Sequence, residues 1–262
     1  MSLDNKQKTG ASSDDQGSGI NHWLRLSDEM ALYILHHLPQ ESLMTVSLIN
    51  KKFRDLSRDD SLWKELTIEY EDIKHKEESC GELVHRCKEL TIRVSTRGNS
   101  KMLGELANLE KLEVLNLMIT GYHDSLIPIM KSVFKKLRKL KRVEIDFVSG
   151  VVRECFVDAL VTNNPDLRVL HLMNYSFLSD ETLDLLANSC LGLEEFSYSC
   201  VDDGKDNRAL SDRGIERMVD SAKNLKYLRL DLDLFRGRAP RVTRDQVRRL
   251  WWLYPDIHIL IK

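Results

Sequence analysis

The stretch Leu112-Glu-Val-Leu-Asn-Leu117 carries the pattern that decides the fold, with large apolar residues at its first, fourth and sixth positions. The alternation at its end predicts a strand with one buried face. Seven further copies of the pattern occupy residues 63–68, 87–92, 140–145, 167–172, 193–198, 225–230 and 254–259. Successive copies start 24 to 32 residues apart. Such self-similarity at a nearly constant step is typical of a repeat array.

A helical period separates the strand patterns. The apolar residues that follow it are Met102, Leu103, Leu106 and Ala107, then Leu126, Ile129, Met130, Val133, Phe134 and Leu137, then Phe156, Val157, Leu160 and Val161. Helix starts are indicated by Ser100, by Asp124, by Ser179 or Asp180, by Ser211 or Asp212, and by the capping box Thr243-x-x-Gln246. One strand and one helix in each repeat predict an α/β fold, a curved solenoid with parallel strands on its concave side and helices on its convex side.

A shorter helical pattern precedes the repeats. Residues 1–19 contain almost no large apolar side chain, and we expect a disordered tail over residues 1–22. From Leu26 to Leu56 the apolar residues follow a helical period in three short segments, for which Ser27 and Asn50 are the expected caps of the first and the third. Helices of two or three turns are marginal alone, so we expect these to leave an apolar patch for a partner.

This helical segment resembles an F-box from Leu26 to Trp63. The resemblance rests on the start Leu26-Ser-Asp-Glu29, the basic step Lys51-Lys-Phe-Arg54 and the close Asp59-Asp-Ser-Leu-Trp63. Two positions depart from the family pattern, because Ser27 replaces the usual proline and Phe53 replaces the usual tryptophan. The resemblance implies a short three-helix F-box over residues 23–63.

The repeats resemble the cysteine-containing type of leucine-rich repeat, which often follows F-boxes. The similar residues are Leu178-Ser-Asp-Glu-Thr-Leu183 with Cys190, and the parallel Leu210-Ser-Asp-Arg-Gly-Ile215. This second resemblance implies a leucine-rich-repeat solenoid of about seven to eight repeats over residues 64–262.

Together the two resemblances imply a receptor rather than an enzyme. F-boxes bind the Skp adaptor protein, which links them to a cullin, and a repeat domain behind an F-box binds a target protein. The implied function is the non-catalytic substrate-recognition subunit of a Skp–cullin–F-box ubiquitin ligase. The adaptor-binding residues that this implies, among which the sequence does not separate core from interface, are Leu26, Ser27, Glu29, Met30, Ile34, Leu38, Leu43, Val46, Ile49, Phe53 and Trp63. The alternative is a leucine-rich-repeat scaffold or inhibitor that acts without ubiquitylation.

The side chains that alternate with the large strand residues are expected on the concave side. They are Val114, Asn116 and Met118, then Arg142, Glu144 and Asp146, then Val169, His171 and Met173, then Glu195, Ser197 and Ser199, then Tyr227, Arg229 and Asp231. Their mixture of aromatic, Met and Arg side chains is typical of the centre of a protein interface. We therefore expect the target protein to bind there, above all through Val114, Asn116, Met118, Arg142, Glu144, Val169, His171, Met173, Ser197, Tyr227 and Arg229.

Composition excludes several other classes of protein. The 262 residues are 42% hydrophobic and 31% charged, as in a core-forming globular chain, and 39 basic against 41 acidic residues give a net charge of −2. A charge so close to zero predicts neither a nucleic-acid partner nor an anionic membrane. Nowhere do about 18 apolar residues follow one another. Five cysteines without a close pair favour a reducing compartment, so we expect a cytoplasmic or nuclear protein.

Other chemistries have weaker signals. Cys80, His85 and Cys87 could suggest zinc, but structural zinc needs four ligands at a recognisable spacing. Cys87 and Cys190 occupy repeat core positions and are expected to be buried thiols. No glycine-rich phosphate loop or local nucleophile motif occurs, so we expect no metal, no cofactor and no catalytic residue.

Three segments have a second possible role. The basic run 131–142 is either the solvated outer face of a repeat helix or a nuclear localisation patch. The basic segment 236–249 is either soluble surface or a site for an acidic substrate or a phosphate. The insertion 201–209 lengthens one repeat step to 32 residues and is a candidate recognition loop.

Overall fold

The structure is a computed structural model that describes residues 25–69, 87–95, 100–121, 126–148, 156–175, 178–199, 210–232 and 241–261. The predicted tail, residues 1–22, lies outside these ranges. The chain divides into two compact units, Met1–Ser57 and Arg58–Lys262.

The described part of the first unit, residues 25–57, contains three short α-helices, α1 (Asp28–Leu35), α2 (Gln40–Val46) and α3 (Lys51–Leu56). Both predicted caps are confirmed: the Ser27 hydroxyl accepts a hydrogen bond from the Met30 N–H at 3.3 Å, and the Asn50 side chain accepts one from the Phe53 N–H at 3.0 Å. Lys52 joins α3 to the start of α1, because its Nζ lies 3.0 Å from Asp28 Oδ1 and donates to the Leu26 carbonyl at 2.5 Å. The buried apolar core of this unit is Ala31, Leu35, Leu43 and Phe53.

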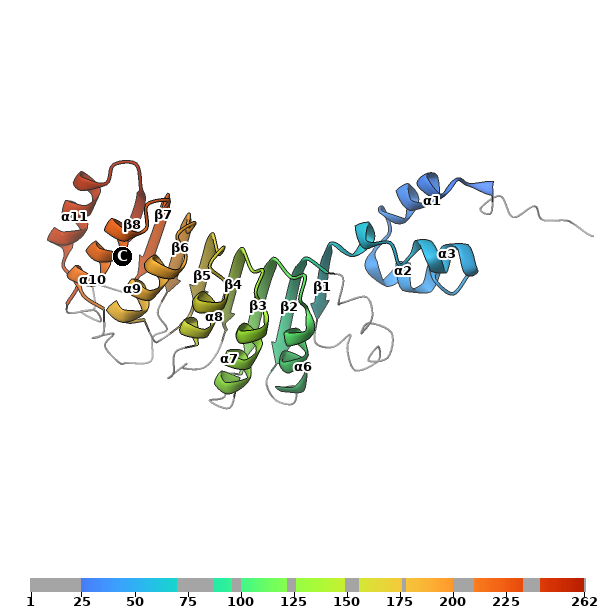
Figure 1. The fold of residues 1–262 in the computed structure, drawn as a ribbon, viewed down its shortest axis with the longest axis horizontal. Helices are drawn as coiled ribbons and strands as arrows, with labels where there is room; N and C mark the ends of the chain where they lie inside the picture. Colours follow the sequence, from blue (N-terminus) through green and yellow to red (C-terminus); the bar gives the residue numbers. More distant parts are fainter. Residues whose placement is uncertain are drawn as a thin grey trace, which may run out of the picture. The chain divides into compact units, whose positions relative to one another are not determined.

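The second unit is a repeating array of strands and helices (Figure 1). Its short helix η2 (Asp60–Trp63) leads into the strands β1 (Glu65–Glu69), β2 (Glu89–Ser95), β3 (Val114–Thr120), β4 (Arg142–Phe147), β5 (Val169–Met173), β6 (Glu195–Ser199), β7 (Tyr227–Asp231) and β8 (His258–Ile261). The helices that follow β2 to β7 are α6 (Ser100–Glu105) with η3 (Leu106–Asn108), α7 (Leu126–Lys136), α8 (Val157–Asn163), α9 (Asp180–Ser189), α10 (Asp212–Ser221) and α11 (Arg244–Leu253).

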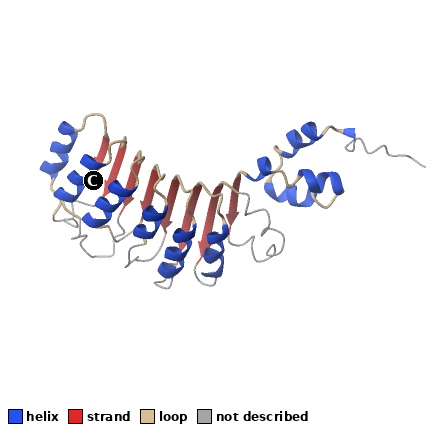
Figure 2. Cartoon of the chain, viewed as in Figure 1, coloured by secondary structure: helices blue, strands red, loops and turns tan. Residues whose placement is uncertain are grey.

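All eight strands pair in parallel in one sheet, in the order β1 to β8. Within the sheet, each strand therefore pairs with its neighbours in sequence. The helices lie along one side of the sheet (Figure 2). The α/β solenoid predicted from the sequence is confirmed, and each predicted repeat pattern overlaps the start of one of these strands.

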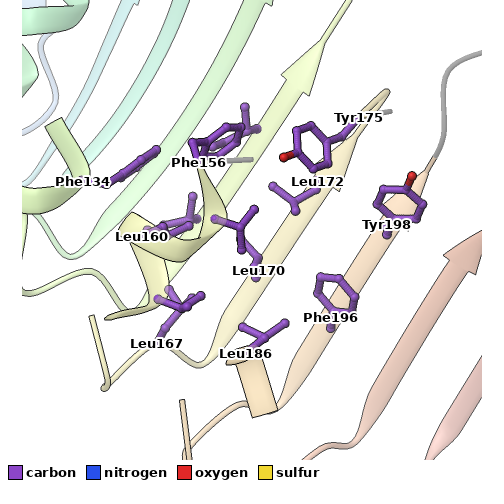
Figure 3. Close-up of a cluster of buried hydrophobic side chains, with 14 of the residues drawn as sticks. Phe134, Phe156, Leu160, Leu167, Leu170, Leu172, Tyr175, Leu186, Phe196 and Tyr198 are labelled. Atoms are coloured by element: carbon purple, nitrogen blue, oxygen red, sulfur yellow. The ribbon is translucent and has the colours of Figure 1, made fainter. Parts of the chain in front are cut away.

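One row of side chains forms the centre of the core. Strand pairing aligns Leu90, Leu115, Val143, Leu170, Phe196 and Leu228, all of which are fully buried. Figure 3 shows Leu170 and Leu172 of β5 beside Leu160 of α8. Rings continue the packing through the array, since the Phe134 and Phe156 centroids are 5.7 Å apart and Tyr175 contacts both Phe156 and Tyr198.

A second link between repeats occurs at the starts of the last three helices. Ser179, Ser211 and Thr243 cap α9, α10 and α11, as the sequence predicts. The Asp180 carboxylate accepts from the Ser211 N–H at 2.8 Å and from its hydroxyl at 2.5 Å. Asp212 accepts in the same way from Thr243, at 2.7 and 2.6 Å. Ser211 and Thr243 are thus each held by the helix of the preceding repeat.

Gly214 shows how closely these two repeats approach. A Cβ atom at this position would lie 2.0 Å from Asp180 Oδ1. The glycine therefore leaves room for the carboxylate that holds Ser211, which explains a residue of low helix propensity inside α10.

The last repeat differs from its prediction. The pattern at 254–259 aligns Ile257 with Leu228, but in the sheet Ile259 pairs with Leu228 and Ile261 with Leu230. Tyr254 caps the end of α11, and the Ile257 N–H bonds to its carbonyl as the Leu225 N–H bonds to that of Ala222. Counted from the end of the preceding helix, the chain thus reaches β8 one residue sooner than it reaches β7. The spacing of apolar residues does not reveal this difference.

Asp180→Ala tests the link between repeats. We expect it to lower the free energy of unfolding by about 1 to 3 kcal/mol, because two hydrogen bonds to a carboxylate disappear. Chemical denaturation of the full chain measures the change. Asp158→Ala is the control, since Asp158 also lies in the first turn of a helix but is exposed, whereas Asp180 is half-buried. Equal losses in the two variants would contradict the proposed role of Asp180.

Candidate functional site

Among the described residues of the first unit, four large apolar side chains are exposed. They are Met30 (58% exposed) and Tyr33 (69%) on α1, with Leu48 (76%) and Ile49 (61%) directly after α2. We call these four residues the exposed apolar set. A solvated surface does not need four such side chains on a unit this small, so they indicate a surface that a partner covers.

The structure divides the predicted adaptor-binding residues into three groups. Met30 and Ile49 are exposed, as are Ser27 and Glu29 at the start of α1. The half-buried residues are Leu26, Ile34, Leu38 and Val46. Leu43, Phe53 and Trp63 are buried, so these three belong to the core.

Two members of the exposed apolar set were missed by the sequence analysis. Tyr33 lies three residues after Met30 and therefore on the same side of α1, a spacing that could have identified it. Leu48 adjoins Ile49 after the end of α2, where no helical period applies, and the sequence carries no signal for its exposure.

Glu29 remains charged at the start of α1. Its own backbone N–H and then the Ser27 hydroxyl hold the pKa of this exposed carboxyl below its ordinary value. An acidic side chain at this place suits the helix N-terminus.

A comparison with protein families now bears on these helices. Residues 23–69 match the model of the F-box-like family. The chain carries an F-box-like domain. The match includes the three helices, η2 and β1, whereas a comparison with curated proteins gives no match for the chain. This match confirms the F-box resemblance of residues 26–63. A parallel α/β repeat array follows the domain, as the sequence analysis expected.

The second candidate surface is the side of the sheet that faces away from the helices. Strand pairing places its side chains in three rows, which we call the concave face. The first row contains Glu89, Val114, Arg142, Val169, Glu195, Tyr227 and His258. The middle row contains Thr91, Asn116, Glu144, His171, Ser197, Arg229 and Leu260, and the third contains Arg93, Met118, Asp146, Met173, Ser199 and Asp231.

All the predicted target-binding residues lie on the concave face, and all but Ser197 are half-buried. Ser197 is only 5% exposed. The sequence analysis did not single out Thr91 and Arg93 on β2, the second strand of the sheet, or His258 on β8, the last strand. The His258 ring stacks on Tyr227 with centroids 5.4 Å apart.

His171 is at the centre of a network of charged side chains. Its Nδ1 lies 3.3 Å from Glu144 Oε1, and its Nε2 lies 3.6 Å from Glu195 Oε2. Arg142 also binds Glu144, with its Nε donating at 3.0 Å. These contacts join the side chains of β4, β5 and β6 across the concave face.

Asn174 directly follows Met173, the third-row residue at the end of β5. It has a positive φ of 55°, a conformation that asparagine tolerates better than most residues. Its side chain donates to Asp146 Oδ1 at 2.7 Å, and its N–H donates to the Ser199 hydroxyl at 2.9 Å. Asn174 therefore positions two residues of the concave face, a role for which the sequence pattern has no signal.

Alternating charges cross the rim at which the strands start. Glu113 binds Lys141 at 2.7 Å and Lys88 at 3.7 Å. Glu194 binds Lys226 at 2.5 Å and Arg168 at 3.3 Å. Bonds from Lys141 and from Lys226 lower the pKa of Glu113 and of Glu194 respectively. The pairs link neighbouring repeats, and such exposed pairs contribute little stability each.

Several other candidates fall partly or wholly outside the described residues. Cys80, His85, the loop 201–209 and residues 236–240 of the basic segment 236–249 lie there. Among the described residues, no group of three or more His, Cys, Asp or Glu side chains could hold a metal ion. Within the same ranges, no helix has the length and apolar character needed to cross a membrane. In the basic run, Lys135 and Lys136 are exposed at the end of α7.

Cys190 behaves as a core residue. It is fully buried at the end of α9, and burial raises the pKa of its thiol to about 12. Its Sγ lies 3.5 Å from the Asn164 carbonyl. Because thiolate is the reactive form, a neutral buried thiol cannot serve as a nucleophile.

We expect Cys190 to resist alkylation by iodoacetamide at pH 8 in the folded protein and to react after denaturation. A raised pKa keeps the thiol protonated at this pH, and burial blocks access. Mass spectrometry of the peptide that contains Cys190 measures the modified fraction. Rapid modification before unfolding would show that the thiol is accessible.

Proposed function

We propose that this protein is the substrate receptor of a Skp–cullin–F-box ubiquitin ligase. Its F-box-like domain docks the Skp adaptor, and through it a cullin, while the repeat array binds the target protein. The observation that carries the proposal is the F-box-like match over residues 23–69.

The exposed apolar set supports adaptor docking. Met30 and Tyr33 are exposed on α1, and Leu48 and Ile49 are exposed after the end of α2, whereas the few buried residues of the unit already form its own core. Burial of large side chains of this kind under a partner is the main source of affinity in protein interfaces. In this role Leu43 and Phe53 act indirectly, since they hold the helices in place.

The contacts between successive repeats support the receptor role. Parallel pairing and the Asp180 and Asp212 links hold each repeat against the next. A receptor of this kind carries out no chemistry. It raises the effective concentration of a target lysine near the charged conjugating enzyme, and a rigid array does this better than a flexible one.

Ile49→Asp tests adaptor docking. We expect it to reduce co-purification with a Skp adaptor at least about tenfold, because a charge would be desolvated in the interface without a partner. Leu191→Asp is the matched control, since Leu191 is 68% exposed in the repeat unit and is expected to leave adaptor binding unchanged.

Circular dichroism of both variants shows whether the helices remain folded. Undiminished adaptor binding by the folded Ile49→Asp variant would exclude the exposed apolar set as the docking surface. If the unaltered chain itself binds no Skp adaptor, the scaffold or inhibitor alternative becomes the better description.

A further inference from the structure

The helix α11 is the last one of the array (Figure 1), and it differs from α9 and α10 along one side. The capping residues Ser179, Ser211 and Thr243 give the three helices a common frame. The first, fifth and eighth residues after the cap lie on one side of each helix, and we call these three positions the forward edge. They are Asp180, Asp184 and Ala187 in α9, Asp212, Glu216 and Val219 in α10, and Arg244, Arg248 and Trp251 in α11.

Carboxylates of the forward edge hold the following helix in the two earlier repeats. Besides the bonds to the capping residues, Asp184 accepts a hydrogen bond from Arg217 of α10 at 2.8 Å. Glu216 lies 3.0 Å from Arg249 of α11 and accepts a hydrogen bond from Gln246 at 3.2 Å. The array therefore joins an acidic forward edge to a polar and basic side of the next helix.

On α11 the forward edge has the opposite charge. Arg244 and Arg248 stand where the earlier helices carry carboxylates, and both are exposed. Trp251 stands where α9 and α10 carry buried aliphatic residues, and it is 52% exposed. Trp252 beside it is 82% exposed. Among the described residues no helix follows α11, so no further helix of these ranges covers this basic and aromatic surface.

The sheet, unlike the helix layer, is partly closed at this end. The His258 N–H bonds to the Lys226 carbonyl, so the alternating backbone groups of Ile259 face away from β7. The Trp251 indole N–H donates to the Ile259 carbonyl at 2.8 Å. An edge strand that is covered in this way is a poor site for another strand. A partner at this end is therefore expected against the helix and not as a further strand.

The charge of the last repeat selects an acidic partner. Residues 241–261 contain four arginines and two aspartates, a net charge of +2, whereas the whole chain has a net charge of −2. Arg248 lies 3.3 Å from Asp245, but both side chains are exposed, so this pair holds neither group firmly. A second copy of the chain is disfavoured, because α10 and α11 carry Arg217 and Arg249 on the side that packs on a preceding helix.

The spacing of the arginines favours a helix among acidic partners. Arg244 and Arg248 are four residues apart, which is about 6 Å along the helix axis. Two carboxylates four residues apart on a partner helix have the same separation. A nucleic acid or an anionic membrane would also bring closely spaced phosphates over the exposed Asp245 and Asp256, which would repel them. A helix with a few spaced carboxylates meets the arginines and avoids the aspartates.

We propose that the forward edge of α11 docks an acidic amphipathic helix of a partner protein, which lies beside α11 as α10 lies beside α9. Two carboxylates of the partner pair with Arg244 and Arg248. Apolar residues further along the partner helix cover Trp251 and Trp252. That this partner is a ubiquitylation target rests on the proposed function, whereas the docking itself does not.

The probe is a set of fluorescein-labelled, alanine-rich peptides of about 16 residues, a length that supports an isolated helix. Each peptide carries two identical residues four apart, either Glu, Gln or Lys, followed three and four residues later by leucines. Fluorescence anisotropy measures their binding to the full chain. We expect the Glu peptide to bind at least about tenfold more tightly than the Lys peptide, with the Gln peptide between them.

Arg248→Glu should abolish the preference for the Glu peptide or reverse it, and Arg248→Gln should weaken it. Lys135→Glu is the matched control, because Lys135 is exposed in the last turn of α7 and the same change of charge there should leave the preference intact. The melting temperature of each variant shows that it remains folded.

Trp252→Ala separates docking from stability. Because Trp252 is exposed, we expect an unchanged melting temperature and at least about fivefold weaker binding of the Glu peptide. Leu191→Ala truncates another exposed side chain and should change neither quantity. Undiminished binding of the Glu peptide by Trp252→Ala would contradict the proposed contact.

Four results would overturn the proposal. The first three are binding of none of the peptides by the folded chain, a preference for the Lys peptide, and a Glu preference that survives in Arg248→Glu. The fourth is dimerisation, or binding of phosphatidylserine vesicles or of oligothymidylate, that Arg248→Glu abolishes, since it would assign the edge to another occupant.

Adaptor co-purification is measured on the same preparations. Loss of adaptor binding with intact peptide selection would reject the ligase role alone. Intact adaptor binding without peptide selection would reject the docking of an acidic helix alone.

Discussion

The parallel pairing of each strand with its immediate neighbours in sequence is the constraint on which the repeat unit depends. It aligns Leu115, Val143, Leu170 and Phe196 in one buried row, so a displacement of one strand by a single residue would turn apolar groups outward in that repeat. The same register orders the opposite face, where Asn116, Glu144 and His171 become neighbours although 55 residues separate the first from the last.

Helix contacts strengthen this arrangement most clearly between the last three repeats. Asp180 and Asp212 each hold the capping residue of the next helix, and the interval from Ser179 to Ser211 equals that from Ser211 to Thr243, at 32 residues. Ser211 thus accepts a hydrogen bond from its own helix and donates one to the helix of the preceding repeat. The same residue therefore links local helix formation to the stacking of repeats.

The sequence predicts the α/β solenoid well because both of its periods are strong. Each strand pattern contains two alternating core residues, and the caps at Ser27, Asn50, Ser179, Ser211 and Thr243 depend on short-range geometry that a residue type largely determines. The register of β8 could not be obtained in this way. Ile257, Ile259 and Ile261 all fit an alternating pattern, and the contacts with β7 decide between the alternatives.

The candidate surfaces were predictable in position but not in detail. Alternation identifies which side chains leave the core, and so it places His171 and Arg229 correctly on the concave face. It cannot show that the Asn116 side-chain nitrogen donates to Thr91 while the side-chain oxygen has no hydrogen-bond partner, because these contacts depend on distances across strands. Leu48 was missed for a similar reason, since its exposure depends on how the turn after α2 is placed.

The separation of the sheet into a buried side and an open side has an evolutionary consequence. Residues such as Val169, Glu195 and Tyr227 contribute little to the core, whereas Leu170, Phe196 and Leu228 beside them are fully buried. Substitutions at the first group can therefore alter the open side of the sheet at small cost in folding, while the second group must be preserved. A lineage of such proteins can change its exposed chemistry on an unchanged framework, because mutations that alter the surface and mutations that alter stability fall at alternate positions of the same strands.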